Sequence, residues 1–293
     1  MGVDADDRLH FLMDNNPIES GSAMRQVFHW TILFFASHIS FAQGTVVTYL
    51  ANEGVMVWDG NTKILFDPLY DRSYGRYQMV PDRVRNAIFS GDAPYDNVFA
   101  VFISHHHGDH FSAADTLRLL QSRKDVLVYA PAQAVAAVVA LAGERDQGIL
   151  DRLTGLDLNY GDIPVNMIAG NLVIDAAHIP HSGWPTARTD VQNIAFRVTL
   201  NDGTTVLHLG DADARTVHFE NDEAYWDETT IELALPPYWY FLSDDGIEIL
   251  ENRLDVIYTI GIHAPSAFND PSNMPEKLLG YDVFTNPGEG RRF

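Results

Sequence analysis

The sequence predicts an α/β protein in which two β-sheets pack face to face and helices cover their outer faces, a four-layer α/β/β/α sandwich. Two observations lead to this fold class. Short β-rich runs occur in two groups, in which turns such as Asn-Asp-Gly join consecutive strands, and helical segments are inserted between them. The 293 residues are 46% hydrophobic and 20% charged, which excludes a disordered or fibrous chain and supplies a large core.

The elements follow from local patterns along the chain. A fully apolar strand over 98–104, typical of a strand buried on both faces, follows a loop-rich segment over 67–97. Helices are expected at 111–123 and at 131–143, where Pro stands at the start and Gly at the end. Further helices are expected near Ala214, over 246–253 and near 272–279. The other predicted strands are 45–50, 54–58, 63–66, 126–130, 163–168, 171–177, 194–200, 205–210, 231–236 and 255–261.

The N-terminal segment resembles an export signal. Residues 27–41 form an apolar run of signal-peptide length, and Ser40 and Ala42 are small residues suited to cleavage after Ala42. Translation is expected to start at Met24, so that residues 1–42 are an extension plus signal peptide and residues 43–293 are the mature domain, periplasmic or secreted. The alternative is a buried or interfacial helix. The run is shorter than the roughly 20 apolar residues of a membrane span, so no stable span is expected in the mature protein.

Charge and cysteine content narrow the function. Asp and Glu number 40 against 19 Lys and Arg, a formal charge of −21, which repels phosphate backbones, so no nucleic-acid partner is expected. The absence of Cys excludes thiolate ligands and thiol nucleophiles. Twelve His are present, and four of them fall within residues 105–110.

That His-rich segment follows the apolar strand directly. His105 and His107 are two residues apart, so in extended backbone their side chains point the same way and can share one metal ion. Asp109 and His110 come after Gly108, where the chain can turn sharply, and can face a second ion. Imidazole and carboxylate ligands suit zinc, with manganese or iron as alternatives.

The segment resembles the His-x-His-x-Asp-His motif of the metallo-β-lactamase superfamily and matches it at every fixed position. Further family elements occur in the family's order, each at a predicted strand end. They are Phe66-Asp67-Pro68, a segment that contains His178 and His181, Leu209-Gly210-Asp211, and Ile262-His263. The resemblance implies the four-layer fold over nearly all of residues 45–265.

The resemblance also implies a site with two divalent metal ions. The implied ligands are His105, His107, His181, Asp109, His110 and His263, with Asp211 between the ions. His181 is favoured over His178 as the third-motif ligand because it is followed by Ser, which leaves His178 to support a ligand. Asp67 is expected to hold a ligand His through a hydrogen bond.

The resemblance implies hydrolysis by a hydroxide that bridges the metals, with Asp109 and Asp211 as catalytic carboxylates. Gly210-Asp211 departs from the zinc β-lactamases, which lack the bridging Asp. Residues 49–68 and 193–196 are similar to the branch of ascorbate-phosphate lactonase-like and N-acyl-phosphatidylethanolamine phospholipase D-like hydrolases.

The expected substrate is therefore a small ester, lactone or phosphodiester. The alternatives are a phospholipase D-like phosphodiesterase that acts on a lipid-derived substrate at a lipid surface, and a non-catalytic zinc-binding module. The sequence leaves the oligomeric state open.

Two further features keep both a functional and a structural interpretation. The aromatic residues within 236–241 could line a substrate pocket or pack against a sheet edge. The loop-rich segment holds arginines that could meet an anionic substrate or be solvated loop charges. They are Arg72, Arg76, Arg83 and Arg85.

Overall fold

The computed structural model describes residues 44–220 and 223–293. The predicted start at Met24, the extension and the signal peptide over residues 1–42 lie outside the described residues. None of the helices within the described ranges has the length and apolar composition that crossing a membrane requires.

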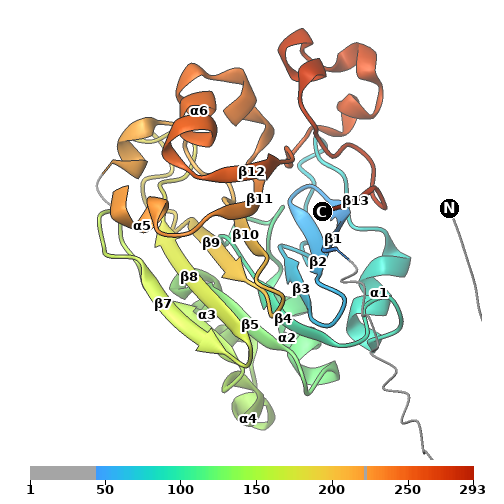
Figure 1. Cartoon of the computed structure of the whole chain (residues 1–293). Helices are drawn as coiled ribbons and strands as arrows, with labels where there is room; N and C mark the ends of the chain where they lie inside the picture. Colours follow the sequence, from blue (N-terminus) through green and yellow to red (C-terminus); the bar gives the residue numbers. More distant parts are fainter. Residues whose placement is uncertain (1–43, 221–222) are drawn as a thin grey trace, which may run out of the picture. The chain divides into compact units, whose positions relative to one another are not determined.

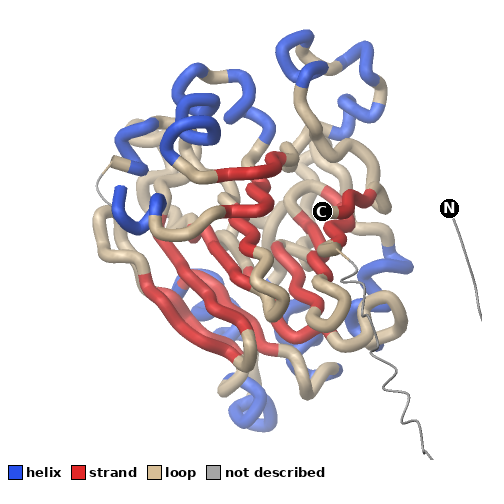
Figure 2. Tube along the Cα trace, in the orientation of Figure 1, coloured by secondary structure: helices blue, strands red, loops and turns tan. Residues whose placement is uncertain are grey.

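Two mixed sheets form the centre of the molecule, with helices at the periphery (Figures 1 and 2). The first sheet contains, in spatial order, β13 (Gly290–Arg292), β1 (Val46–Ala51), β2 (Gly54–Trp58), β3 (Lys63–Phe66), β4 (Val98–Phe102), β5 (Leu127–Pro131) and β6 (Leu153–Leu156). The second sheet contains β12 (Val256–Thr259), β11 (Ile231–Leu235), β10 (Thr205–His208), β9 (Ile194–Thr199), β8 (Leu172–His178) and β7 (Val165–Ala169).

Turn chemistry and crossover helices explain the strand directions. The strands β1, β2 and β3 pair antiparallel through short turns, as do β7 with β8 and β9 with β10, whereas the antiparallel pair β8–β9 is joined by a longer loop over 179–193. The pairs β4–β5 and β10–β11 are parallel, because longer connections return the chain to the same end of the sheet. The helices are α1 (Asp82–Ser90), α2 (Ala113–Ser122), α3 (Ala132–Leu141), α4 (Gln147–Leu150), α5 (Glu223–Asp227) and α6 (Asp244–Glu248).

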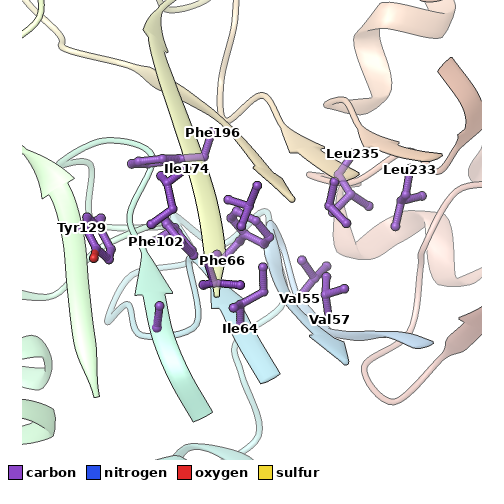
Figure 3. Close-up of a cluster of buried hydrophobic side chains, with 14 of the residues drawn as sticks. Val55, Val57, Ile64, Phe66, Phe102, Tyr129, Ile174, Phe196, Leu233 and Leu235 are labelled. Carbon is purple, nitrogen blue, oxygen red and sulfur yellow. The ribbon is translucent and has the colours of Figure 1, made fainter. Parts of the chain in front are cut away.

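Three apolar clusters separate the layers. The central cluster lies between the sheets, where Phe102 of β4 packs against Phe66 of β3 and Phe196 of β9 with ring centroids 5.2 and 5.1 Å apart (Figure 3). A second cluster joins the outer face of the first sheet to α1, α2 and α3, and a third packs the segments before and after α6 on the second sheet. This arrangement confirms the predicted four-layer sandwich.

The structure differs from the prediction in several local elements. The segment expected to be loop contains α1, which begins after Pro81, ends at Gly91 with φ 73°, and buries only Ile88 and Phe89. Strands β6 and β13 were not predicted.

The expected helix near Ala214 is the 3₁₀ turn Thr216–Phe219. The expected last helix is divided into 3₁₀ turns, Ser266–Asn269, Pro271–Asn273 and Glu276–Gly280, because prolines interrupt a continuous helix there. The helix expected over 246–253 is α6 followed by a π-helical turn, Ile249–Arg253. A further 3₁₀ turn, Glu144–Asp146, precedes α4, and another, Tyr238–Leu242, precedes α6.

The carboxyl ends of several strands meet at one edge, where the two sheets approach each other. The backbone N–H of Ile194 at the start of β9 donates to the Ser104 carbonyl beyond β4 at 2.8 Å, and this bond joins the sheets there. The backbone N–H of His263 beyond β12 donates to the Asn52 carbonyl in the β1–β2 turn at 2.9 Å. Segments distant in the sequence are thereby fixed side by side.

Candidate metal centre

The His-rich segment after β4 divides its side chains between two groups. His105 lies three residues beyond the end of β4, and the His107 carbonyl accepts hydrogen bonds from the N–H groups of His110 at 3.0 Å and Phe111 at 2.9 Å. This turn separates His105 and His107 from Asp109 and His110. The chain turns at Gly108 as predicted, although the backbone there does not enter the left-handed region. A Cβ on Gly108 would lie 2.7 Å from Cδ of Arg72, so the exposed Arg72 side chain passes close over this turn.

The first group contains the ligands predicted for the first ion. The ligand atoms of His105, His107, His181 and Asp211 all lie within 4.8 Å of one another. Nδ1 of His107 is 3.1 Å from Nε2 of His105 and 3.1 Å from Nε2 of His181. Oδ2 of Asp211 is 3.1 Å from the same nitrogen of His181. Three strand ends, those of β4, β8 and β10, therefore supply this group.

The second group contains Asp109, His110 and His263, whose ligand atoms also lie within 4.8 Å of one another. The Nε2 atoms of His110 and His263 are 3.1 Å apart, and Oδ2 of Asp109 is 3.6 Å from Nε2 of His263. Oδ1 of Asp211 is 2.9 Å from that same Nε2. Asp211 thus presents one carboxylate oxygen to each group.

The hydrogen-bond pattern of the imidazoles fits bound cations. Nδ1 of His181 is 2.9 Å from the Ser182 carbonyl, which can only accept, so this nitrogen carries the proton and Nε2 presents a lone pair. Nδ1 of His110 likewise donates to Oδ2 of Asp67 at 2.9 Å. Lone pairs and carboxylate oxygens therefore converge in a buried space, where a divalent cation satisfies them.

The electrostatics of the buried groups agree with this fit. Burial lowers the pKa of His107 to about 4, so its imidazole is neutral at pH 7, as a ligand must be. Burial alone would raise the pKa of Asp211, but His263 and His110 hold it well below its usual range. Burial alone would lower the pKa of His110, but Asp211 and Asp67 raise it well above its usual range. The carboxylates therefore favour positive charge in this space.

Asp67 was expected to hold a ligand histidine through a hydrogen bond, and it contacts residues of both groups. Its Oδ1 accepts the backbone N–H of Ser104 at 2.7 Å, and its Oδ2 accepts the Ser104 hydroxyl at 2.5 Å. Because the hydroxyl proton is used there, Oγ of Ser104 accepts from Nδ1 of His105 at 3.0 Å. Sequence reasoning missed Ser104, although its place directly before His105 was a usable signal.

Two asparagines that carried no predicted role fix the ligand loops. Nδ2 of Asn52 donates to the Asp109 carbonyl at 2.9 Å, while the Asn52 carbonyl holds the backbone of His263. Oδ1 of Asn193 accepts the backbone N–H of Asp211 at 2.9 Å. The side-chain amides thus hold Asp109 and Asp211, while the Asn52 backbone carbonyl holds His263, about two hundred residues away in the sequence.

Glu53 is a second residue that sequence reasoning missed. Its side chain is fully buried, and neither oxygen has a hydrogen-bond partner among the described residues. Oε2 lies 3.6 Å from Nδ1 of His110 and 3.6 Å from Nε2 of His208. A Glu in the β1–β2 turn next to Asn52 offered no pattern that would place it behind the ligands.

His178 and His208 lie outside both ligand groups. Nε2 of His178 is 3.3 Å from the Val191 carbonyl, and His178 belongs to neither ligand group. Of the two third-motif histidines, His181 is therefore the one that the fold brings to the other candidate ligands. His208 is buried and stacks on the ring of Phe66 with centroids 4.8 Å apart.

An open hollow of about 350 Å³ lies over the two groups. His107, Asp109, His181 and Asp211 contribute to its lining, and the other lining residues are Tyr74, Arg76, Tyr77 and Arg188. Within the aromatic run, the Trp239 ring is 5.2 Å from that of His263, whereas Tyr240 and Phe241 are buried in the outer cluster of the second sheet. The run therefore serves packing: Trp239 lies beside His263, its successors lie in the core, and the lining of the hollow includes none of residues 236–241.

Comparisons with known proteins agree with this geometry. Residues 62–230 match a family described as Beta-lactamase superfamily domain. No curated protein matches the sequence.

Solved structures resemble the chain at low sequence identity, which is likeness of fold alone. A possible metal-dependent hydrolase from Veillonella parvula is 15% identical, with 85% of this chain and 100% of that chain covered and a TM-score of 0.53. Igni18, a metallo hydrolase from Ignicoccus hospitalis, is 17% identical, with 85% and 98% covered and a TM-score of 0.54. An isothiocyanate hydrolase from Delia radicum gut bacteria is 16% identical, with 85% and 99% covered and a TM-score of 0.57. The matched family, the fold and the His/Asp clusters together establish that this chain belongs to the metallo-β-lactamase superfamily.

Proposed function

We propose that this protein is a hydrolase that uses two divalent cations to cleave a small ester, lactone or phosphodiester. The observation that carries the proposal is the position of Asp211, whose two oxygens lie 3.1 Å from His181 and 2.9 Å from His263. A carboxylate shared in this way suits a pair of ions rather than one. Imidazole and carboxylate donors without thiolate suit zinc, with manganese or iron as alternatives.

The ligand groups assign the ions to residues. The first cation would be held by His105, His107 and His181, the second by Asp109, His110 and His263, and Asp211 would contribute to both. When bound, such a pair supplies hydroxide at neutral pH and polarises the attacked carbonyl or phosphoryl oxygen. Asp67 keeps the Nδ1 protons of His105, through Ser104, and of His110 in place, which would leave both Nε2 lone pairs free to bind a cation.

The carboxylates at the floor of the hollow would handle the proton. Both carboxylates line the hollow, but both oxygens of Asp211 face ligand groups, whereas Oδ2 of Asp109 lies farther from the imidazoles, 3.6 Å from His263 and 3.8 Å from His110. Asp109 is therefore the better placed of the two to orient the nucleophile and take its proton, with Asp211 chiefly a ligand. The chemistry needs no Ser or Cys nucleophile.

The finer branch assignment is also a proposal. The early segment around Asn52 and the segment beginning at Asn193 support the branch of ascorbate-phosphate lactonase-like and phospholipase D-like hydrolases. Export to the periplasm or the medium is proposed from residues 27–42 alone, and N-terminal sequencing of the protein from its native cell would test it.

Metal analysis and a substrate panel test the function. We expect about two zinc ions per chain after reconstitution and turnover of at least one phosphodiester, lactone or simple ester. His107→Ala should cause the loss of one ion and abolish turnover. Asp211→Ala should lower the affinity of the protein for both ions. The matched control is His178→Ala, since His178 lies in the same chain segment as His181 but outside both groups. Stoichiometric metal without turnover of any substrate would favour the non-catalytic zinc-binding module, and full activity of His107→Ala would refute the ligand assignment.

A further inference from the structure

Two arginines line the hollow together with the candidate metal ligands. The lining includes Arg76 and Arg188 beside His107, His181 and Asp211. The hollow holds about 350 Å³, near the lower end of the range of small-molecule sites, which is about 300–1,000 Å³. Whatever binds there meets the ligand groups and the two guanidinium groups at once.

Arg76 is held on the side of the second ligand group. Its carbonyl accepts hydrogen bonds from the backbone N–H and the hydroxyl of Ser266 at 2.8 and 2.9 Å, which ties its loop to the segment after His263. Its guanidinium donates to the Tyr238 hydroxyl at 3.0 Å and lies 5.4 Å from the ring centroid of Tyr77. Tyr77 in turn places its ring edge-on to His263 at 4.2 Å. These contacts orient a cationic group that still has free donors.

Arg188 is held on the side of the first ligand group. Its Nη1 donates to the Ser182 carbonyl at 3.0 Å, and the same carbonyl accepts from Nδ1 of His181. Arg188 has a φ of 56°, in the left-handed region that non-glycine residues seldom adopt. Such strained positions concentrate at binding and catalytic sites, where the surrounding structure maintains them.

Several arginines of the described residues are neutralised by carboxylates, whereas the two that line the hollow are not. Arg85, Arg123, Arg197 and Arg291 each form an ion pair with a carboxylate. Within the described residues, neither Arg76 nor Arg188 has a carboxylate partner, although the chain carries 40 acidic residues. With the proposed cations bound, these two guanidinium groups would outweigh the Asp109 and Asp211 carboxylates of the lining and make the hollow positive in a protein of charge −21. A field focused in this way attracts anions.

We infer that the substrate carries an anionic group, a carboxylate or a phosphate, in addition to the bond that is cleaved, and that Arg76 and Arg188 bind this group. The inference rests on the proposed hydrolase function and names its substrate class. The guanidinium fork matches carboxylate and phosphate oxygens, often through two parallel hydrogen bonds. The volume of the hollow limits the substrate to a small molecule.

Two esters with the same leaving group test the inference by their relative turnover. The zinc-loaded protein is assayed with 4-nitrophenyl acetate, which is neutral, and with the mono-4-nitrophenyl ester of glutaric acid, which carries a free carboxylate. We expect kcat/KM to favour the anionic ester. In the double variant Arg76→Gln/Arg188→Gln, the ratio of the two kcat/KM values should fall by about tenfold or more, as expected for loss of charge-assisted hydrogen bonds.

Arg83→Gln is the control, because it removes one guanidinium charge from exposed Arg83 of helix α1, outside the hollow. This variant should leave the ratio unchanged. An equal ratio in the wild type and the double variant would overturn the inference.

A binding experiment separates failure of the inference from failure of the proposed function. If the wild type hydrolyses neither ester, calorimetric titration of the zinc-loaded protein with glutarate and with glycerol 3-phosphate still measures anion binding. Tighter binding to the wild type than to the double variant would support the inference, and the preferred anion would distinguish a carboxylate from a phosphate. Equal binding of both anions to the two proteins would overturn it.

Discussion

Asp67 and Ser104 are joined by two hydrogen bonds, from the Ser104 N–H to Oδ1 at 2.7 Å and from the Ser104 hydroxyl to Oδ2 at 2.5 Å. The carboxylate lies directly after β3 and the serine two residues after the end of the neighbouring parallel strand β4. Through Ser104 the carboxylate orients His105, and through Oδ2 it orients His110 directly. One buried side chain therefore orients a ligand in each candidate metal group.

The first prediction concerns this carboxylate. Asp67→Asn replaces one acceptor by an NH₂ group that faces other donors, so the orientation of His105 and His110 is lost. We expect the affinity for zinc to fall by about 10–100-fold, as for other residues that hold metal ligands. Competition with a chromogenic chelator measures this affinity. Asp92→Asn is the control, since the exposed side chain of Asp92 accepts from the nearby Ser90 hydroxyl, and an equal affinity in the two variants would contradict the role of Asp67.

Gly210 precedes Asp211 with a φ of 58°, and a Cβ there would lie 2.5 Å from Oδ1 of Asn193 and 2.7 Å from Cβ of Ser104. Gly210→Ala must therefore displace Asp211 from one or both ligand groups. We expect loss of bound zinc, measured by elemental analysis, together with a lower melting temperature. Gly203→Ala is the control, because Gly203 has a φ of 92° and a Cβ there would meet no atom of the described residues within 4 Å. It should cost only the backbone strain of about 1–3 kcal/mol and keep its zinc.

The buried carboxyl of Glu53 should make the stability of the metal-free protein depend on pH. Burial raises the pKa of this carboxyl well above its ordinary value of 4.5, and His110 only partly opposes the rise. The folded protein then holds a proton that the unfolded chain has released, so stability falls as the pH rises above the ordinary value. Glu53→Gln, which stays neutral, should remove this fall and raise the melting temperature at neutral pH by about 2–4 °C.

Thermal unfolding in the presence of a chelator, followed from acid to neutral pH, checks the Glu53 prediction. Glu251→Gln changes an exposed carboxyl and should leave the pH profile of the wild type unaltered. Parallel profiles for the wild type and Glu53→Gln would show that Glu53 is charged in the folded state.

The buried pair Arg197–Asp175 predicts a stability effect separate from the metal centre. Nε of Arg197 lies 3.0 Å from Oδ2 of Asp175, and Nη1 donates to the Tyr225 carbonyl at 2.6 Å. Asp175→Ala leaves a buried charge uncompensated and should lower the free energy of unfolding by about 3–5 kcal/mol. Denaturant titration measures this loss, which the double variant Asp175→Leu/Arg197→Met should largely reverse. Zinc content should be unchanged in both, and a coupled loss of zinc would contradict the separation.

The strands were predicted well because most of them are short apolar runs between turn residues, a pattern that local sequence contains. Helix α1 was missed because only Ile88 and Phe89 are buried on it, which leaves little apolar periodicity to detect. Strand β13 was missed because its three residues pair with β1 from the far end of the chain. Neither the length nor the composition of such an edge strand identifies it without its partner.

The sequence by itself determined the four-layer fold class and the spacing of His105, His107, Asp109 and His110, because strand alternation and ligand type are local properties. Resemblance added His181, Asp211 and His263, and the fold brings all three to that segment. Only the tertiary structure decided that Ser104, Asn52 and Glu53 lie behind the ligands and that Arg76 and Arg188 face the same hollow. Those roles depend on which strand ends become neighbours when two sheets pack, and no short stretch of chain contains that information.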